Sequence, residues 1–380
     1  MLLAVSEIKQ NKLKFSLIVL SLTLMVFLLV SLSALGNGLI LGMAGVVKSL
    51  NTDLIVFQKG SHLSLQRSNL NMSVQEKLED IEGVDRVVPF GQFVVTLKEG
   101  KKTFDGALIP AAIDPMVNPA LVDGRALTKE DENGVVVDHS VTKQGVKIGD
   151  EVSIEATGRK LKIIGFTRDR RLSMLPTVYM NVDMWQKVKF ETVMKVTTGR
   201  AYEQKGTEFI NAFLVKAKPG SDIEALKKRI SDKVDGVEPA TRDEAADAFP
   251  GMAPMVMVVV ALEALAFIIG TVIVGIFFYI LTLQKISQVG MLKAIGASSF
   301  YIFKDLVTQV CILTLFGLVL GTCLAYAASF AIPPTIVMDF TVSGIAPMLI
   351  GVFVMSFVGS LFSLRHIIKI DAIIAIGQNG

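Results

Sequence analysis

Residues 284–298 read QKISQVGMLKAIGAS and separate two long apolar runs, residues 253–283 and 300–330. Each run is longer than the roughly 20 residues that an α-helix needs to cross a lipid bilayer. The basic, glycine-containing stretch between them is therefore expected to form a tight hairpin loop at one membrane face. Lys285 and Lys293 predict that this face is cytoplasmic, because short loops rich in Lys and Arg stay on that side.

The composition of the 380 residues is that of a membrane protein, with 51% hydrophobic residues and a net charge of +3. Most charged residues lie between positions 48 and 247, so a water-exposed domain is expected there. The small net charge gives no indication of a nucleic-acid partner. Both cysteines, Cys311 and Cys323, lie in one expected membrane helix, where a separation of about 18 Å is too long for a disulfide.

Two further apolar runs complete the expected membrane part. The run at 15–47 follows Lys9, Lys12 and Lys14, and it is about twice too long for a signal peptide, so a retained helix with a projecting outer end is expected. A last apolar run at 344–364 precedes another basic cluster, which places both chain termini in the cytoplasm. The expected divisions are 1–14, a cytoplasmic interfacial helix; 15–47, transmembrane helix 1 with an outer stalk; 48–250, the extracytoplasmic domain; 251–283, transmembrane helix 2; 284–299, a cytoplasmic coupling segment; 300–331, transmembrane helix 3; 332–343, an outer loop; 344–364, transmembrane helix 4; and 365–380, a cytoplasmic tail.

The extracytoplasmic domain contains a weak internal repeat of strand, helix, Gly-Val and strand. In each half, a pattern typical of a helix-opening capping box follows the first strand. Two such halves predict a split β-α-β unit of the ferredoxin-like kind. The segments are a strand at 54–57, a capping box at 73–76, a helix to about residue 81 and a strand at 87–89, and then a strand at 210–215, a capping box at 221–224, a helix to residue 234 and a strand at 237–239.

Residues 121–198 differ from both halves, because short β runs bounded by glycines fill them. We interpret them as a small β-rich subdomain inserted into the first. The sequence therefore predicts an α-helical membrane protein with four transmembrane helices plus an α+β extracytoplasmic domain, the latter a ferredoxin-like unit with an inserted β-rich subdomain.

Motifs for catalysis are missing from the sequence. It has no G-x-x-x-x-G-K-[ST] loop for ATP and no nucleophile elbow. The three histidines, His62, His139 and His366, stand far apart, so no zinc-ligand spacing occurs. We expect no catalytic residue, no metal site and no bound cofactor in this chain, and any ATP hydrolysis is expected in a partner subunit.

Glu263 lies about ten residues inside the outer end of transmembrane helix 2. A charged group at the centre of a membrane helix costs roughly 2.5–3.5 kcal/mol on insertion scales. One hypothesis is that Glu263 faces a cavity or a dimer interface and contacts the transported molecule or a proton. The alternative is a hydrated or paired position in the outer interface.

Methionines gather near the same level. Met252, Met255 and Met257 lie where transmembrane helix 2 enters the membrane, and Met43 is expected at the matching level of helix 1, with Met338 and Met348 on either side of the outer turn. Thioethers suit an apolar substrate path or a soft metal such as haem iron. The alternative is ordinary packing at helix ends.

The sequence of residues 289–298, VGMLKAIGAS, resembles the signature that follows the second membrane helix in MacB/FtsX-type ABC transporter permeases. The resemblance in layout extends over the whole chain. It implies a multi-pass protein of the bacterial cytoplasmic membrane, a homodimer or pseudo-dimer in contact with membrane lipid and seated on cytoplasmic ABC ATPase subunits. It also implies mechanotransmission, in which a push on the coupling segment is carried outward by helices 1 and 2. The residues that would couple to the ATPase are Lys285, Gln288, Gly290, Leu292, Lys293, Ile295 and Gly296.

The N-terminal region, including residues 14–18, 24–32 and 51–53, resembles that of haem-exporting and glycolipid-exporting permeases. Haem is therefore the first candidate for the exported substrate. Export of a lipid, lipoprotein or peptide is the first alternative. The second is an FtsX-like transmitter that signals across the membrane without transport.

Overall fold

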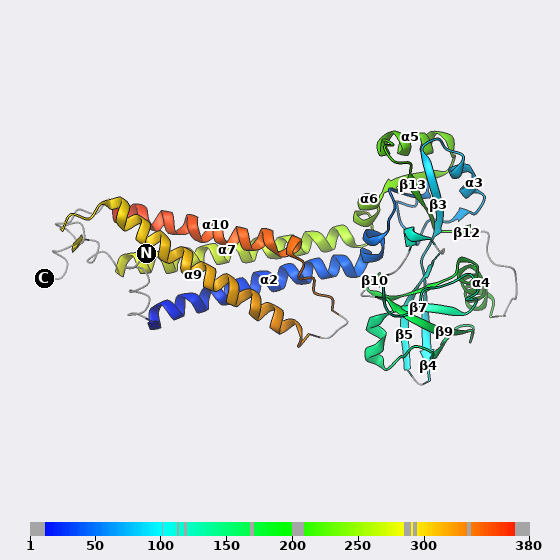
Figure 1. Cartoon of the computed structure of the whole chain (residues 1–380), viewed down its shortest axis with the longest axis horizontal. Coiled ribbons are helices and arrows are strands. Elements are labelled where there is room, and N and C mark those ends of the chain that lie inside the picture. The colour runs from blue at the N-terminus through cyan, green and yellow to red at the C-terminus, as the bar shows by residue number, and fades with distance from the viewer. Residues whose placement is uncertain are drawn as a thin grey trace. The chain divides into compact units, whose positions relative to one another are not determined.

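A computed structural model describes residues 12–100, 102–111, 114–117, 120–167, 171–199, 209–284, 290–291, 295–332 and 336–368, without the side chains of 14, 281–282, 299, 302 and 359–368. The chain divides into two compact units. One comprises Met1–Gly38 with Val256–Gly380, and the other comprises Leu39–Met255. Figure 1 shows the elements of both along the chain.

The first unit consists of long apolar helices, which confirms a helical membrane-type protein. The described residues contain three stretches long and apolar enough to cross a membrane, Phe15–Ser49, Met252–Ile280 and Phe303–Ser329. A fourth, shorter apolar stretch is Val342–Val358. The helices that carry them are α2 (Lys12–Ser49), α7 (Met252–Gln284), α9 (Ser299–Ser329) and α10 (Val342–Ile368).

Close contacts at glycines define the direction of α7 against α2. Gly36 lies against Val259, and a Cβ on Gly270 would lie 2.5 Å from Met25 Cε. The α2 position falls from 36 to 25 as the α7 position rises from 259 to 270, so the two helices are antiparallel.

The helix α9 runs parallel to α2 and approaches it through a small-xxx-small pair. A Cβ on Gly317 would lie 2.6 Å from Leu22 Cβ, and one on Gly321 would lie 2.6 Å from Val26 Cβ. Glycines four residues apart let two membrane helices approach closely. The N-termini of α2 and α9 therefore lie at the same end of this unit.

The second unit contains a four-stranded antiparallel sheet of order β14-β1-β13-β3. The predicted strand at 54–57 is confirmed as β1. The sheet alternates strands from the two halves of the repeat, and one helix follows the first strand of each half. Its elements are β1 (Leu54–Gln58), α3 (Val74–Glu79), β3 (Val84–Phe90), β13 (Ala212–Ala217), α5 (Ile223–Lys233) and β14 (Val237–Thr241), with a separate small pair of β2 (Leu70–Asn71) and β12 (Phe209–Ile210).

Both predicted capping boxes are wrong. Ser73 precedes α3 with helical φ/ψ of −61° and −15°, and its hydroxyl caps no N–H, because an N-cap side chain reaches back only from a β-region backbone. At the second position the cap of α5 is Asp222, whose carboxylate accepts from Glu224 N at 3.0 Å. A capping box does occur at Thr241, where it opens α6 (Arg242–Asp247).

A larger sheet of eight strands has the order β10-β11-β5-β4-β8-β9-β6, and β7 pairs with β11 and β9. The predicted insertion at 121–198 therefore starts too late. The strands at 93–110 join this sheet as a hairpin because a tight turn at Gly100 (φ +59°) brings β4 onto β5, and β5 then pairs in parallel with β11. The elements are β4 (Phe93–Glu99), β5 (Lys102–Pro110), β6 (Leu121–Gly124), β7 (Gly134–Asp138), β8 (Glu151–Ile154), β9 (Lys160–Thr167), β10 (Arg171–Leu172), β11 (Leu175–Met180), α4 (Val182–Thr198) and the 3₁₀ turns η1 (Pro115–Val117) and η2 (His139–Gln144).

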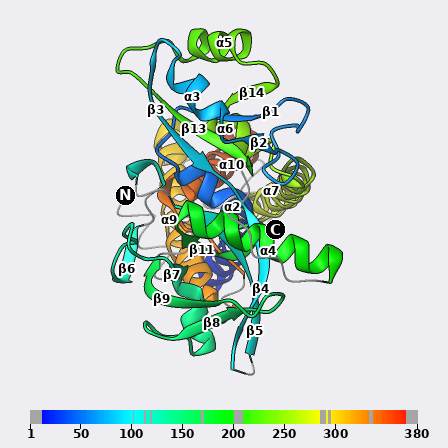
Figure 2. The same ribbon diagram turned by 90° about the vertical axis from the view of Figure 1, so that its right-hand side faces the viewer.

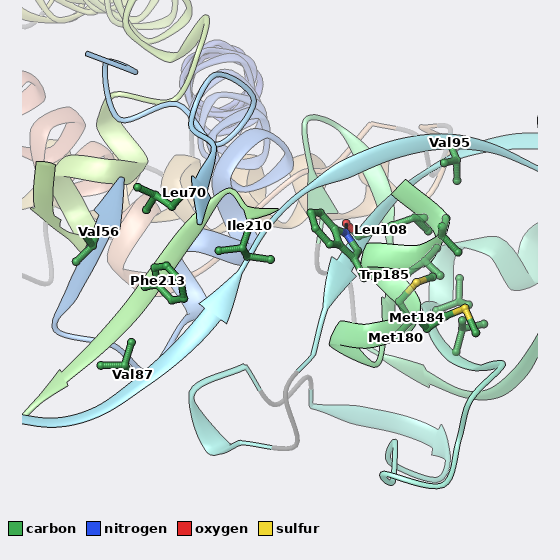
Figure 3. Packing of buried hydrophobic residues seen from close by; sticks show 14 of the residues in the cluster. Val56, Leu70, Val87, Val95, Leu108, Met180, Met184, Trp185, Ile210 and Phe213 are labelled. Carbon is green, nitrogen blue, oxygen red and sulfur yellow. Dashed lines mark hydrogen bonds between the residues drawn. The ribbon is translucent and has the colours of Figure 1, made fainter. Parts of the chain in front are cut away.

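One apolar core runs through this unit. Figure 2 shows α4 in front of the strands of the larger sheet, and Trp185 of α4 is fully buried and donates its indole N–H to Leu108 O of β5 at 3.0 Å. Figure 3 shows Trp185 with Met180 and Met184 at one end of the core, and Val56 and Phe213 of the four-stranded sheet at the other. The two sheets thus share one hydrophobic cluster.

Candidate functional site

An open apolar groove of about 980 Å³ lies between α2 and α7. Among the described residues, Ser21 and Ser31 are the only polar side chains in its lining, and most of the rest are leucines and isoleucines. A cavity of this size fits the range of pockets that bind small molecules. We call it the α2–α7 groove, defined by Leu24, Leu28, Leu35, Leu262, Ile269 and Ile273.

A segment between α9 and α10 contributes Ile336 and Met338 to the lining of the groove. We call residues 336–341 the strap. Asp339 N in the strap donates to Ala34 O of α2 at 2.9 Å. Gly38 makes this approach possible, because any Cβ there would overlap the backbone carbonyl of Val337.

Glu263 does not line the α2–α7 groove. It is half-buried, one helical turn from Phe267 and on the same face as Val274, both of which pack in the apolar cluster of the bundle. Within the described part of the chain, its carboxylate has no hydrogen-bond or ion-pair partner.

The predicted methionines do not converge on one point. Met257 is 72% exposed, Met255 is half-buried and Met252 is 3% exposed. Met43 contacts the position of a Cβ on Gly251 at 3.4 Å, in the second unit.

Two methionines of the described residues line the groove, Met338, which belongs to the predicted methionine cluster, and Met25, which the sequence analysis did not select. The signal that could have found Met25 is the face of α2 that repeats every three or four residues from position 21 to position 35.

Of the predicted coupling residues, Gly290, Ile295 and Gly296 lie in the described part of the chain, whereas Lys285, Gln288, Leu292 and Lys293 lie outside it. Ile295 is 81% exposed. Gly296 has φ +94°, a left-handed conformation that glycine adopts without strain. The described residues therefore present an exposed apolar side chain directly before a glycine in a turn.

The hairpin β10–β11 contacts the C-terminal part of α2. Its turn consists of Ser173 and Met174, whose φ angles are +55° and +64°. Ser173 N donates to Met43 O at 3.0 Å, and Met174 N donates to Gly42 O at 2.8 Å. We call these two turn residues the hairpin tip.

The contact coincides with a kink in α2. Ala44 has non-helical φ/ψ of −125° and 18°, directly after the two carbonyls that the hairpin tip occupies. A foreign donor inserted into the helical hydrogen-bond ladder is a recognised cause of such a kink. Gly42 leaves room for the Met174 thioether, with which a Cβ would overlap, and Gln92 Nε2 donates to Ser173 Oγ at 2.8 Å.

Two charge pairs stabilise the second unit away from these features. The Arg125 guanidinium beside Asp131 holds the pKa of that carboxyl well below its usual range. Lys227 lowers the pKa of Glu244 by a hydrogen bond that joins α5 to α6. In the described ranges no group of three or more His, Cys, Asp or Glu side chains is arranged to hold a metal.

Comparison with known proteins finds two family models. The MacB-like periplasmic core domain matches residues 15–233, and the FtsX-like permease C-terminal domain matches residues 256–372. A protein of Staphylococcus haemolyticus, provisionally named hemin transport system permease protein HrtB, is 25% identical over 375 residues and 99% of both chains. An ABC transporter permease of Mycobacterium bovis, uncharacterised by name, is 21% identical over 98% of both chains.

Among solved structures, the periplasmic region of MacB from Actinobacillus actinomycetemcomitans matches at 20% identity. The match covers 51% of this chain and 90% of that one, with a TM-score of 0.35.

Proposed function

Because the chain belongs to the MacB/FtsX-type permeases of ABC transporters, we propose that it is the membrane subunit of an ATP-driven exporter of the bacterial cytoplasmic membrane. A separate cytoplasmic ATPase supplies the energy. Four helices span the membrane with both termini inside, and the alternating directions of α2, α7 and α9 support this topology. The four-stranded sheet of the outer domain is assigned to the ferredoxin-like arrangement on its strand order.

The substrate is a hydrophobic or amphipathic molecule that enters from the bilayer. The observation that carries this proposal is the α2–α7 groove, whose apolar lining matches such a molecule and excludes a hydrated solute. Haem is the first candidate, since a relative over the full chain bears a hemin transport name. The thioethers of Met25 and Met338 offer soft contacts to its iron.

The mechanism is mechanotransmission through α2. This helix extends from Lys12 to Ser49 with a kink at Ala44, so a movement of its N-terminal part is passed along the helix as far as Gly42 and Met43, directly before the kink. The hairpin tip holds two of its carbonyls and therefore passes that movement to the larger sheet. An FtsX-like signal transmitter would use the same connection, and it is the second candidate function; lipid, lipoprotein or peptide export is the other alternative.

A homodimer is part of the proposal. In the most apolar window of α7, 6% of the residues are buried, compared with 44% for α2. A helix that buries so few of its apolar residues suits an interface with a second copy or with lipid. Glu263 is assigned to the substrate path or to that interface.

The test is ATP hydrolysis by the complex with its co-purifying ATPase in lipid nanodiscs, titrated with haem and with a control amphiphile. Two neighbouring isoleucines give a matched pair of variants. Ile269 lines the α2–α7 groove and is 50% exposed, whereas Ile268 lies outside the lining and is 62% exposed. Haem is expected to change the rate in the wild type and in Ile268→Trp, and to have no effect in Ile269→Trp.

A flat response to haem with ATPase activity still present would remove haem and favour the lipid, peptide or signalling alternatives. If Ile268→Trp and Ile269→Trp lose the response of ATP hydrolysis to haem equally, the groove is not the substrate site.

A further inference from the structure

A second groove, of about 610 Å³, lies between α2 and α9 and is separate in lining from the α2–α7 groove. Its walls are aliphatic and aromatic side chains that include Phe15, Leu20, Phe316 and Leu324. Leu20 is 52% exposed and Leu324 is 43% exposed, so the groove opens to the surroundings of the helical unit along its side. In a membrane, those surroundings are acyl chains.

The exposed polar groups of this groove lie at one end, and the buried Thr23 lies at the other. Lys12 and Ser16, one helical turn apart on the same face of α2, line the end nearest the N-terminus, and both are exposed. The Lys12 ammonium has no salt-bridge or hydrogen-bond partner within the described part of the chain. Thr23 is the residue of α2 in the lining that lies farthest from Lys12. The groove therefore extends about 16 Å along the helix.

A cation and a hydroxyl at the mouth of a long apolar groove form the complement of an anionic phospholipid. We propose that the α2–α9 groove binds one anionic phospholipid of the leaflet in which Lys12 lies. The phosphate contacts Lys12 and Ser16, and one acyl chain lies along Leu20 and Phe316. Basic groups at the ends of membrane helices bind such headgroups elsewhere by the same electrostatics.

The proposal rests on membrane insertion of the helical unit and holds whichever substrate the α2–α7 groove takes. Its consequence is that the α2–α9 contact at Gly317 and Gly321 has a lipid at its edge. The packing of α9 on α2 then depends on the lipid composition of the membrane.

The test is native mass spectrometry of the full chain in detergent, incubated with an equimolar mixture of phosphatidylglycerol and phosphatidylcholine. The wild type is expected to retain one phosphatidylglycerol with about a five-fold preference, the factor that about 1 kcal/mol per lysine gives. Lys12→Gln is expected to retain lipid without that preference. Lys304→Gln changes an exposed lysine at the same end of the bundle outside the lining, and it is expected to keep the preference.

Two leucines of α2 test the acyl-chain part. Leu20 lines the groove, whereas Leu17 is equally exposed, at 54%, and lies outside the lining. Leu20→Trp is expected to lose the retained lipid and Leu17→Trp to keep it. If Leu20→Trp does not fold by circular dichroism, Leu324→Trp blocks the same groove from α9.

Three results would overturn the proposal. They are a wild type without a preference for phosphatidylglycerol, an equal loss of preference in Lys304→Gln and Lys12→Gln, and equal lipid retention in groove-blocking and control tryptophan variants.

Discussion

Gly42→Ala is expected to loosen the hairpin tip from α2. The new Cβ would overlap Met174 Sδ, so either the side chain repacks or the hairpin moves. Repacking an overfilled site costs about 1–3 kcal/mol, and the low end applies here because the overlapped sulfur is near the end of the flexible Met174 side chain. Moving away breaks the two backbone hydrogen bonds at 2.8 and 3.0 Å, each with a net contribution of about 0.5–1.5 kcal/mol. The cost therefore falls within about 1–3 kcal/mol, at the low end if the side chain repacks.

Hydrogen–deuterium exchange of the full chain in nanodiscs measures this directly. A cost of 1–3 kcal/mol corresponds to exchange at Ser173 and Met174 that is about 5-fold to 150-fold faster. The double variant Gly42→Ala with Met174→Ala removes the overlap and is expected to restore most of the protection.

Gly45→Ala is the matched control, because a Cβ there would meet its nearest neighbour, Arg171 O, at an ordinary 3.5 Å. Unchanged exchange in Gly42→Ala would refute the reasoning. So would equally fast exchange in Gly42→Ala and in the double variant.

Two further predictions concern charged groups. If Glu263 contacts the substrate on its path, as proposed, Glu263→Gln lowers substrate-stimulated ATP hydrolysis about ten-fold, the effect of one lost hydrogen bond to a charged group, with the basal rate unchanged. If export and dimer assembly are both unaffected, Glu263 has no part in the path. Acidification is expected to weaken the second unit through Asp131, whose depressed pKa makes the stabilisation complete above the unfolded value of about 3.9 and progressively lost as the pH falls below it. Arg125 is 56% exposed, so the effect is expected to stay under about 1 kcal/mol. The midpoint of thermal unfolding, measured between pH 7 and pH 3, should therefore depend less on pH in Asp131→Asn than in the wild type. An identical pH dependence in both would contradict the assignment.

The predictions that rest on the length of apolar runs and on hydrophobic periodicity were the most accurate. The long apolar runs became α2, α7 and α9, and the strand at 54–57 became β1. Local motifs were less reliable, since the real N-cap at Asp222 is one residue from the predicted Ser221. The strands at 93–110 were missed as part of the insertion because their partner β11 lies far along the chain.

The features at the site were harder to predict for physical reasons. A two-residue turn with positive φ normally calls for Asn-Gly, so Ser173-Met174 gave no hairpin signal. The contacts of that turn with α2 are backbone hydrogen bonds between distant segments, which no side-chain pattern encodes. The methionines at 252–257 are close in sequence, but a helix distributes them around its circumference, so adjacency did not mean a shared site.

The backbone hydrogen bond from Asp339 N to Ala34 O joins a segment that is synthesised early to one that is synthesised late. A chain is produced from its N-terminus, and domains generally fold as units as they emerge. The surface of α2 around Gly38 therefore stays uncovered until the strap has been made, long after Leu39–Met255 is complete. This second unit must consequently acquire its fold with one apolar helix in place, so the hairpin tip can engage α2 before α7, α9 and α10 exist to hold that helix.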